Sequence, residues 1–255
     1  MIEQLPAVLT GKGGVVLVTL LAFLVLERLF PVARWVGGIT RVAKNLALAL
    51  CNVAIGPLIV IPVTVYAAGH APQWRPDILT GWTGLAFDLL VLDFWIYWWH
   101  VANHKLPFLW RFHSVHHLDE TLDATTALRF HFGEVALSAV VRAVVIFLLA
   151  VPLTSVVVFE TFIAVITIFH HSNLKLPPAL EKALSWVIVT PSIHWIHHHA
   201  ERADTDSSYS TILSLWDRLF GSRSQTVREP GLPIGVEGMR DLPVVRLLLR
   251  PFLRG

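Results

Sequence analysis

The chain has 255 residues, of which 55% are hydrophobic and only 15% are charged, and its mean hydropathy is +0.62. A soluble domain normally carries about 25% charged residues, so this composition argues against a soluble protein and favours a membrane protein. The formal net charge of +2 decides little by itself, and we expect no nucleic-acid partner. Cys51 is the only cysteine, which excludes a disulfide framework and a thiolate metal site.

Apolar runs along the chain predict the segments that enter the membrane. The first three candidate spans are residues 15–30, 46–68 and 81–99. The third ends in DFWIYWWH, an aromatic cluster typical of a helix anchored at the lipid–water interface. The first residues lack a basic stretch followed by a short apolar region and a cleavage site, so we expect no cleavable signal peptide.

The last apolar run, residues 135–169, is too long for one crossing. As a single helix it would reach about 50 Å, against about 30 Å of hydrocarbon. Pro152 lies near its middle and would remove a helical hydrogen bond. We therefore expect two short helices that form a hairpin, either spanning or partly re-entrant. The fold class predicted is an all-α integral membrane protein with about four transmembrane helices, the last two being this hairpin.

Residues 176–255 are mixed in character, with prolines, short amphipathic pieces and a basic tail. No internal repeat, low-complexity segment or linker marks a second domain, so we expect one domain over residues 1–255. The hairpin returns the chain to the face that it left, which places most cations on the histidine-rich side. The positive-inside rule makes that side cytoplasmic, and the small size favours the cell (inner) membrane of a bacterium. The cations expected there include Arg34, Arg41, Lys44, Lys105, Arg111, Arg129 and Lys175, whereas Lys12 and Arg75 lie opposite.

Histidine is concentrated in one part of the chain, because twelve of the 13 histidines lie between residues 100 and 199. His100 and His104 have the i,i+4 spacing that places two imidazoles on one face of a helix. An HxxHH pattern follows and is repeated about eighty residues later. A structural histidine has no reason to recur at this spacing, so the set predicts metal binding. The two HxxHH boxes are His113, His116 and His117, and His194, His197 and His198, with His131, His170 and His171 between them.

Eight to ten neutral imidazoles are too many for one ion, because zinc usually takes four ligands and an octahedral ion takes six. Two ions are therefore expected. Imidazole suits zinc, iron, copper and nickel. The sequence contains no HExxH pattern, which argues against a zincin-type protease, and a di-haem protein would need only paired axial histidines. Two iron ions that activate dioxygen fit best, although zinc could replace iron in a purified sample.

The motifs from residue 93 to residue 221 resemble the membrane fatty acid hydroxylase and sterol desaturase superfamily. The segments that carry the resemblance are DFWIYWWHVANH, LWRFHSVHH, TALRFHFGE, HHSNLKLP, TPSIHWIHHH and LWDRLFG. The resemblance implies a helical membrane anchor with a cytosolic cap and a dimetal centre at the membrane surface. It also implies oxygen-dependent hydroxylation or desaturation of a lipid.

The resemblance also implies which side chains bind the metals. His131 and His171 are expected as ligands in addition to the boxes, and His170 as a supporting neighbour. His199 is expected to lie beside the site, and His70 to be an ordinary loop histidine. The implied box ligands are His100, His104, His113, His116, His117, His194, His197 and His198.

Five other polar positions each keep two interpretations. Asp93 and Glu134 could each orient a ligand imidazole, as carboxylates near metal sites do, or make a purely structural hydrogen bond. Asn173 could support the site or form a turn. Asp204 and Asp206 are expected to be solvated or to cap a helix, although one of them could hold a histidine.

The predicted function is a lipid monooxygenase that inserts one oxygen atom from dioxygen into a C–H bond, acting on a fatty acyl chain, a sterol or a related lipid. A desaturase with the same centre is the near alternative, and a metal-handling membrane protein is the more distant one. The sequence has no flavin, nicotinamide or iron–sulfur motif. An external electron donor, such as a ferredoxin or a cytochrome b5-like protein, is therefore expected. The donor could dock on a basic face formed by Arg202, Arg218, Arg223 and Arg228. The alternative is that these arginines contact anionic lipid headgroups.

Overall fold

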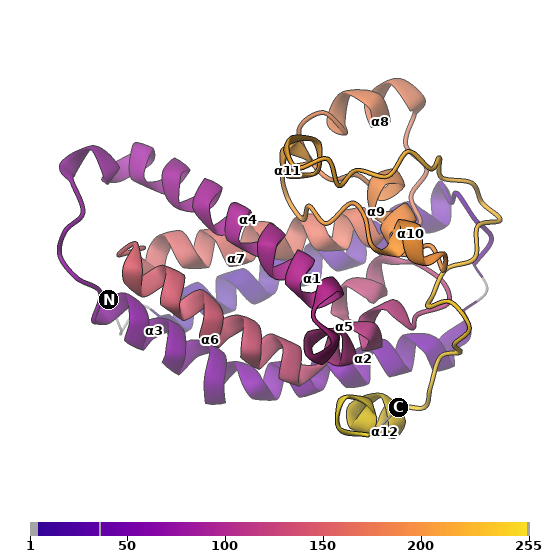
Figure 1. Ribbon diagram of the computed structural model, residues 1–255, viewed down its shortest axis with the longest axis horizontal. Coiled ribbons are helices and arrows are strands. Elements are labelled where there is room, and N and C mark those ends of the chain that lie inside the picture. The colour runs from indigo at the N-terminus through magenta and orange to yellow at the C-terminus, as the bar shows by residue number, and fades with distance from the viewer. Residues whose placement is uncertain (1–4, 36, 254–255) are drawn as a thin grey trace.

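The protein is a bundle of long helices with short helices gathered at one end, as the ribbon of the computed structural model shows (Figure 1). The structure describes residues 5–35 and 37–253, and within these ranges it contains helices and isolated bridges but no strand. The all-helical class predicted from the sequence is therefore confirmed. The long elements are α1 (Leu5–Leu29), α2 (Gly38–Ile55), α3 (Ile61–Gly69), α4 (Gly81–Lys105), α5 (Pro107–His117), α6 (Phe132–Leu148) and α7 (Leu153–His171).

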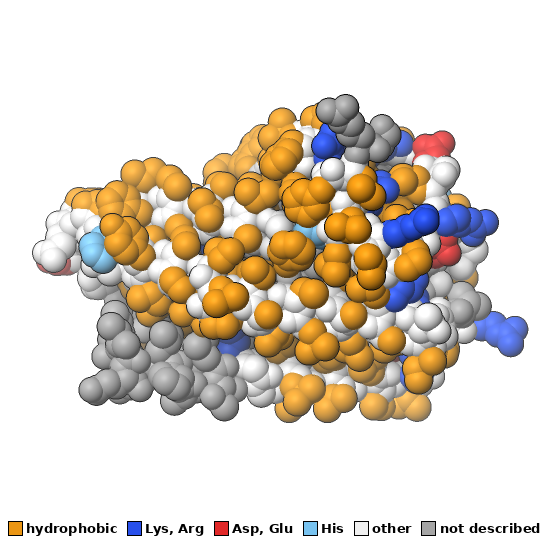
Figure 2. All heavy atoms as spheres, turned by 90° about the horizontal axis from the view of Figure 1, so that it is seen from below, with side chains coloured by type: hydrophobic (Ala, Val, Ile, Leu, Met, Phe, Trp, Pro, Cys, Tyr) orange, Lys and Arg blue, Asp and Glu red, His pale blue; other side chains and the backbone are white. Residues whose placement is uncertain are grey.

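Among the described residues, three helical runs are long and apolar enough to cross a membrane: Gly38–Gly69, Gly81–Lys105 and Leu153–His171. The first joins α2 to α3 through a π-helical turn at Gly56–Val60. Many of its apolar side chains are exposed, Ile39 to 84% and Val53 to 71%, and Figure 2 shows apolar side chains along this flank with Lys and Arg gathered near one end. Exposed apolar surface of this extent indicates contact with lipid. The number of crossings, about four, stays a prediction.

The break expected at Pro152 is present, since α6 ends at Leu148 and α7 begins at Leu153. The turn between them is tied to the loop before α4, because Trp74 Nε1 donates to Leu148 O at 3.0 Å and Arg75 to Ala150 O at 3.1 Å. The other ends of α6 and α7 lie at the histidines. The hairpin therefore leaves and returns at the same end of the bundle.

The cap consists of short helices at that end (Figure 1). Asp93, inside α4, fastens it to the bundle by accepting hydrogen bonds from Ile212 N, Leu213 N and Trp216 Nε1, the last at 2.8 Å. Of the two interpretations of Asp93, the structure shows the structural one. The cap elements are α8 (Pro178–Leu184), α9 (Pro191–His197), α10 (Arg202–Thr205), α11 (Leu215–Leu219) and α12 (Val244–Leu249), with 3-10 turns at Asp77–Leu79, Ala124–Leu128 and Arg250–Phe252 elsewhere.

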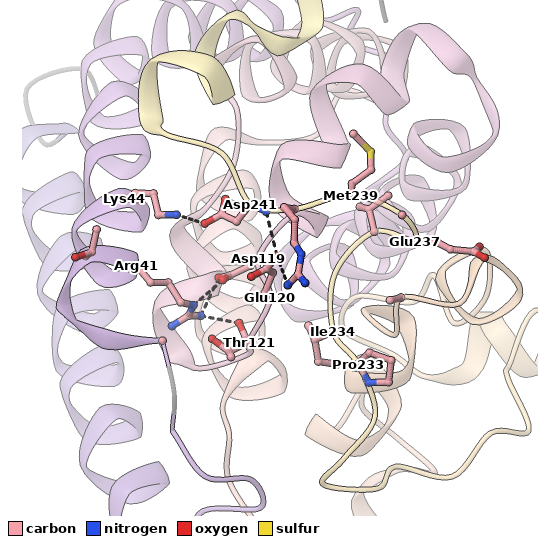
Figure 3. Close-up of a pocket in the computed structure, with 16 residues that line it drawn as sticks. Arg41, Lys44, Asp119, Glu120, Thr121, Pro233, Ile234, Glu237, Met239 and Asp241 are labelled. Carbon is pink, nitrogen blue, oxygen red and sulfur yellow. Dashed lines mark hydrogen bonds and ion pairs between the residues drawn. The ribbon is translucent and has the colours of Figure 1, made fainter.

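A buried ion network joins α2 to the segment that follows α5. Arg41 lies 2.5 Å from Asp119 and 2.6 Å from Asp123, and it also donates to the Thr121 carbonyl (Figure 3). A bidentate guanidinium–carboxylate contact of this kind fixes orientation as well as charge. The network therefore holds the chain rigidly just beyond the second histidine box.

Candidate metal centre

Three helix ends deliver the histidine boxes to one place. α4 continues past its apolar span to Lys105, so His100 and His104 lie on one face of its last turns. Pro107 then starts α5, where its missing N–H costs nothing. α9 begins at Pro191 in the same way and carries the third box. The boxes therefore lie on short rigid helices whose starting points are set by proline.

The histidines gather into two groups, each with one ring nitrogen per residue within 4.8 Å of the others. The first, called here the five-histidine cluster, places His100 Nε2 at 3.2 Å from His113 Nε2. All five side chains are buried, and they come mainly from α4 and α5. The members of this cluster are His100, His104, His113, His117 and His197.

The second group, called here the four-histidine cluster, consists of His116, His171, His194 and His198. The Nε2 atom of His171 lies 3.0 Å from that of His116 and 3.0 Å from that of His194. The Nε2 atoms of His194 and His198 are 3.2 Å apart. Four nitrogens at tetrahedral positions about 2.0–2.1 Å from an ion would lie roughly 3.3 Å apart. The spacing of the nitrogens therefore fits a bound metal ion.

A neutral imidazole is the form that binds metal, and burial favours this form at three of the clustered histidines outside the spans. Burial lowers the pKa of His197 to about 3. Burial, and next the imidazole of His198, lower the pKa of His116 and of His117 well below its usual value. At neutral pH the side chains therefore offer lone pairs and not charges.

Three histidines of the five-histidine cluster have an acceptor at the outer nitrogen, whereas His117 has no hydrogen-bond partner at either ring nitrogen among the described residues. His113 Nδ1 lies 2.8 Å from Glu134 Oε1. His100 Nδ1 is 2.7 Å from the Tyr209 carbonyl, and His197 Nδ1 is 2.7 Å from the Ser207 carbonyl. His104 Nδ1 faces Asp206 Oδ1 at 3.4 Å without hydrogen-bond alignment. Such acceptors fix the tautomer and the ring orientation of a metal-binding histidine.

The four-histidine cluster has weaker support. His171 Nδ1 is 2.7 Å from the Thr167 carbonyl, and His116 Nδ1 is 3.3 Å from the Arg129 carbonyl. The Nδ1 atoms of His194 and His198 are buried and have no hydrogen-bond partner among the described residues. The two clusters thus differ in what holds their ligands.

His131 is the one expected ligand that the structure leaves outside both clusters. Its Nδ1 accepts a hydrogen bond from Gly133 N at 2.9 Å and so caps α6, while its Nε2 lies 3.0 Å from the Leu248 carbonyl. Both ring nitrogens are therefore engaged with the backbone. Gly133 allows the start of α6 to lie against Phe112 of α5, because a Cβ there would lie 2.6 Å from the Phe112 ring.

The remaining polar positions can now be placed. His170 is buried beside His194, with ring centroids 3.9 Å apart. The side chain of Asn173 bonds both the N–H and the carbonyl of Ala33, 140 residues away, which matches neither the supporting role nor the turn expected for it. Asp204 holds His199 at 2.7 Å, and Glu201 completes a small group with them at the rim.

His70 lies in the loop at the far end of the bundle, as expected, with its ring stacked on Tyr66. Asp206 pairs with Lys105 and Arg202. Sequence reasoning missed the backbone carbonyls of Ser207 and Tyr209 as supports, since nothing in a sequence marks a carbonyl.

A cavity of about 490 Å³ opens beside both clusters, bounded by α1, α2, α4, α6 and α7. His100 and His113 of the five-histidine cluster line it, together with three members of the four-histidine cluster. Most other walls are apolar, for example Ile96, Ile163 and Ile168. A lipid chain that enters between the helices would meet the imidazoles at the inner end of this space.

Besides Glu134 near the histidines, three charged residues within the helices also line this cavity: Lys12, Arg142 and Glu160. Sequence reasoning passed over Arg142 and Glu160 as site residues. The signal was present, because a charged residue inside an otherwise apolar membrane segment is itself an indication of function.

Comparison with known proteins agrees with this site. A model of the family described as fatty acid hydroxylase matches residues 85–222. The chain is 26% identical over 198 residues to the ornithine lipid hydroxylase OlsE of Rhizobium tropici, covering 78% of this chain and 59% of that protein. It is 33% identical over 135 residues to the alkylglycerol monooxygenase of Xenopus tropicalis, covering 52% of this chain and 29% of that protein.

A cholesterol 25-hydroxylase-like protein of Danio rerio is 30% identical over 194 residues, 72% of each chain. The chain spans less than two thirds of the first two relatives. No solved structure matches it.

Proposed function

The chain belongs to the fatty acid hydroxylase family, and from this membership we propose that it is a membrane-bound, oxygen-dependent lipid hydroxylase. The observation that supports this most strongly is the position of two buried histidine clusters at the end of one largely apolar cavity. Such a cavity admits an alkyl chain and excludes water. The relatives named above are hydroxylases and a monooxygenase, which favours hydroxylation over desaturation.

Nine histidines are proposed to hold two iron ions, one in each cluster. The ligand set suits iron but also other transition ions, so zinc remains a replacement in a purified sample. When bound, two ferrous ions would supply the activation of dioxygen that inserts one oxygen atom into a C–H bond. His131 is left out of this set, because both of its ring nitrogens are bonded elsewhere.

The chain's own residues prepare the site for that chemistry. His197 and His116 present lone pairs without charge, because burial lowers the pKa of both imidazoles. Glu134 accepts the N–H of His113 and so fixes which nitrogen of that ring faces the cluster. Ile96, Ile163 and Ile168 give the alkyl chain an apolar path to the imidazoles. Asp93 keeps the cap closed over the clusters from within α4.

We place the histidine end of the protein at the cytoplasmic face of a bacterial cell membrane. The Lys and Arg side chains visible at one end in Figure 2 support this placement through the positive-inside rule. Cysteine labelling of intact cells tests it: Ala71→Cys should react with an impermeant reagent from outside, and Ser224→Cys should not.

Turnover is proposed to need an external electron donor, because returning one oxygen atom of dioxygen as water consumes two electrons. Of the basic residues considered for docking, Arg228 lies over the Trp195 ring at 4.3 Å, and burial lowers its pKa to about 10. It therefore belongs to the packing of the cap. Arg202 is exposed while pairing with Asp206 and lying over the Trp110 ring, and Arg223 is half-buried, so these two are proposed to contact an acidic donor.

The test of this function is a comparison of lipid extracts. Cells that express the protein should contain a hydroxylated lipid that carries label from isotopic dioxygen, and His117→Ala should abolish it. His70→Ala is the matched control, since this histidine lies at the opposite end of the bundle and should leave the product unchanged. A product that persists in His117→Ala, or that lacks the label, would contradict the proposal.

A further inference from the structure

The cavity that reaches the histidines contains a group of three charges, called here the charged triad: Lys12, Arg142 and Glu160. Lys12 Nζ lies 2.5 Å from Glu160 Oε2, and the Arg142 guanidinium lies 2.6 Å from Glu160 Oε1. The three residues come from α1, α6 and α7, so the triad joins three helices. All three side chains line the cavity.

The triad lies far from the histidines. Arg142 follows Glu134 by eight residues along α6, which is about 12 Å at 1.5 Å per residue. Glu160 precedes His171 by eleven residues along α7, which is about 16 Å. The apolar part of the cavity occupies the interval between the two ends.

The charges of the triad do not balance. Two cations share one carboxylate, so the group carries a net charge of +1 toward the cavity. Each carboxylate oxygen already accepts from one cation, whereas Arg142 Nε is buried and has no partner among the described residues. A buried donor without a partner costs free energy, and a charge at this depth is costly unless it has a use.

A larger hollow, of about 950 Å³ between α2 and the C-terminal segment, shows the contrasting arrangement (Figure 3). There Arg41 is matched by two carboxylates and Lys44 pairs with Asp241. Arg240 faces Glu120. The cations of that hollow already have their partners, so it has the charge balance of a structural network.

We propose that the charged triad is a subsite for an anionic group of the lipid substrate, a carboxylate or a phosphate. Arg142 and Lys12 bind its oxygens, and Glu160 holds the two cations apart and in place. The alkyl chain then points along the apolar walls to the histidine clusters. This rests on the proposed function only in assigning the reacting carbon, which would lie about 12 to 16 Å from the anionic group and not beside it.

Depth supports this orientation. Glu160 lies seven residues from the start of α7 at Leu153, about 10 Å from the end of the bundle opposite the cap. A lipid with its polar group on that side would reach the triad with its head and the clusters with its chain. Long cationic side chains near a helix end reach toward the interface in the same way.

Binding by the detergent-solubilised full chain tests the subsite without any turnover. Three radiolabelled amphiphiles with the same saturated chain would be compared by equilibrium dialysis: a carboxylate, a phosphate and an alcohol. Wild type should bind at least one anionic amphiphile roughly tenfold more tightly than the alcohol, because a charge-assisted contact is added. A preference for the carboxylate points to a fatty-acid-like substrate, and one for the phosphate points to a phospholipid.

The variants should move in opposite directions. Arg142→Gln and Lys12→Gln should abolish the preference, and Arg142→Lys should retain part of it. Glu160→Gln should increase it, because the competing carboxylate is removed. A triad that only joins the helices predicts instead that all these variants change the three affinities alike.

That equal change, or a preference that survives in Arg142→Gln, would overturn the proposal. Anion binding without any turnover would support the anionic subsite and contradict the proposed hydroxylase function. Turnover of a lipid that does not depend on Arg142 would support the hydroxylase function and contradict the subsite.

Discussion

The two histidine clusters are built from the same side chain but supported differently. In the five-histidine cluster, outer nitrogens meet a carboxylate and two carbonyls, Glu134 being 2.8 Å from His113. In the four-histidine cluster the support comes from carbonyls alone. Each cluster also has two histidines without an outer hydrogen-bond partner within the described residues, so the carboxylate is the difference: they are His104 and His117 in the first, and His194 and His198 in the second. Because a carboxylate on the outer nitrogen raises the basicity of a ligand, the five-histidine cluster should hold its ion more tightly.

Removing one ligand should have the largest effect and should expose this difference. His198→Ala leaves three histidines in the smaller cluster, whereas His104→Ala leaves four in the larger one. We expect His198→Ala to reduce the metal content from about two ions per chain to about one and to abolish hydroxylation. Metal analysis of the purified variants measures this, with His70→Ala as the control. Retention of both ions by His198→Ala would contradict the assignment of the smaller cluster.

Acid should weaken both clusters together and so tests what they share. The pKa of His197 is lowered to about 3 by burial, against about 6.5 in an unfolded chain. Above pH 6.5 the residue is neutral in both states and contributes no pH dependence. As the pH falls from 6.5 toward 3, the unfolded chain binds a proton that the folded chain cannot. Metal-free protein should therefore lose about 1.4 kcal/mol of stability per pH unit for each such histidine.

Thermal unfolding of the metal-free protein between pH 7.5 and 5 measures this loss. The metal-loaded protein should resist the change, because a bound imidazole cannot take up the proton. A melting temperature of the metal-free form that does not fall below pH 6.5 would show that the histidines are not held neutral.

Removing the carboxylate should make the clusters more alike, with the smallest effect of the three. Glu134→Gln retains the shape of the side chain but loses its charge, so the ion of the five-histidine cluster should be held roughly 10- to 100-fold less tightly. Competition with a chelator measures this affinity, and Glu229→Gln at the surface is the matched control. If wild type and Glu134→Gln lose each of their two ions at the same chelator concentrations, then Glu134 does not strengthen metal binding.

The sequence predicted the ligand types better than their grouping. Spacing identified eight of the nine histidines that the fold brings together, because i,i+4 pairs share a helix face whatever the surroundings. The ninth, His171, was expected from the family resemblance. Spacing could not show that His197 lies with the histidines of α4 and α5, whereas its neighbour His198 lies with His171 of α7. That grouping depends on how α9 packs against the other helices. Sequence reasoning also misplaced His131, whose partner Leu248 lies 117 residues away in the cap.

The hairpin was predictable because proline acts locally, and the helix break falls where Pro152 requires it. The role of Asp93 was not, because its partners from Ile212 to Trp216 are brought to it only by the folded cap. Local chemistry was therefore visible in the sequence, and tertiary contact was not.

The chain order of the ligands has a consequence for biosynthesis. Four members of the five-histidine cluster lie between His100 and His117, whereas the four-histidine cluster needs His171, His194 and His198 in addition to His116. As the chain leaves the ribosome and enters the membrane, the first ion has most of its ligands before the hairpin is made. The second ion must wait for the last helices. When metal is scarce, newly made protein should therefore accumulate with one ion in the earlier cluster.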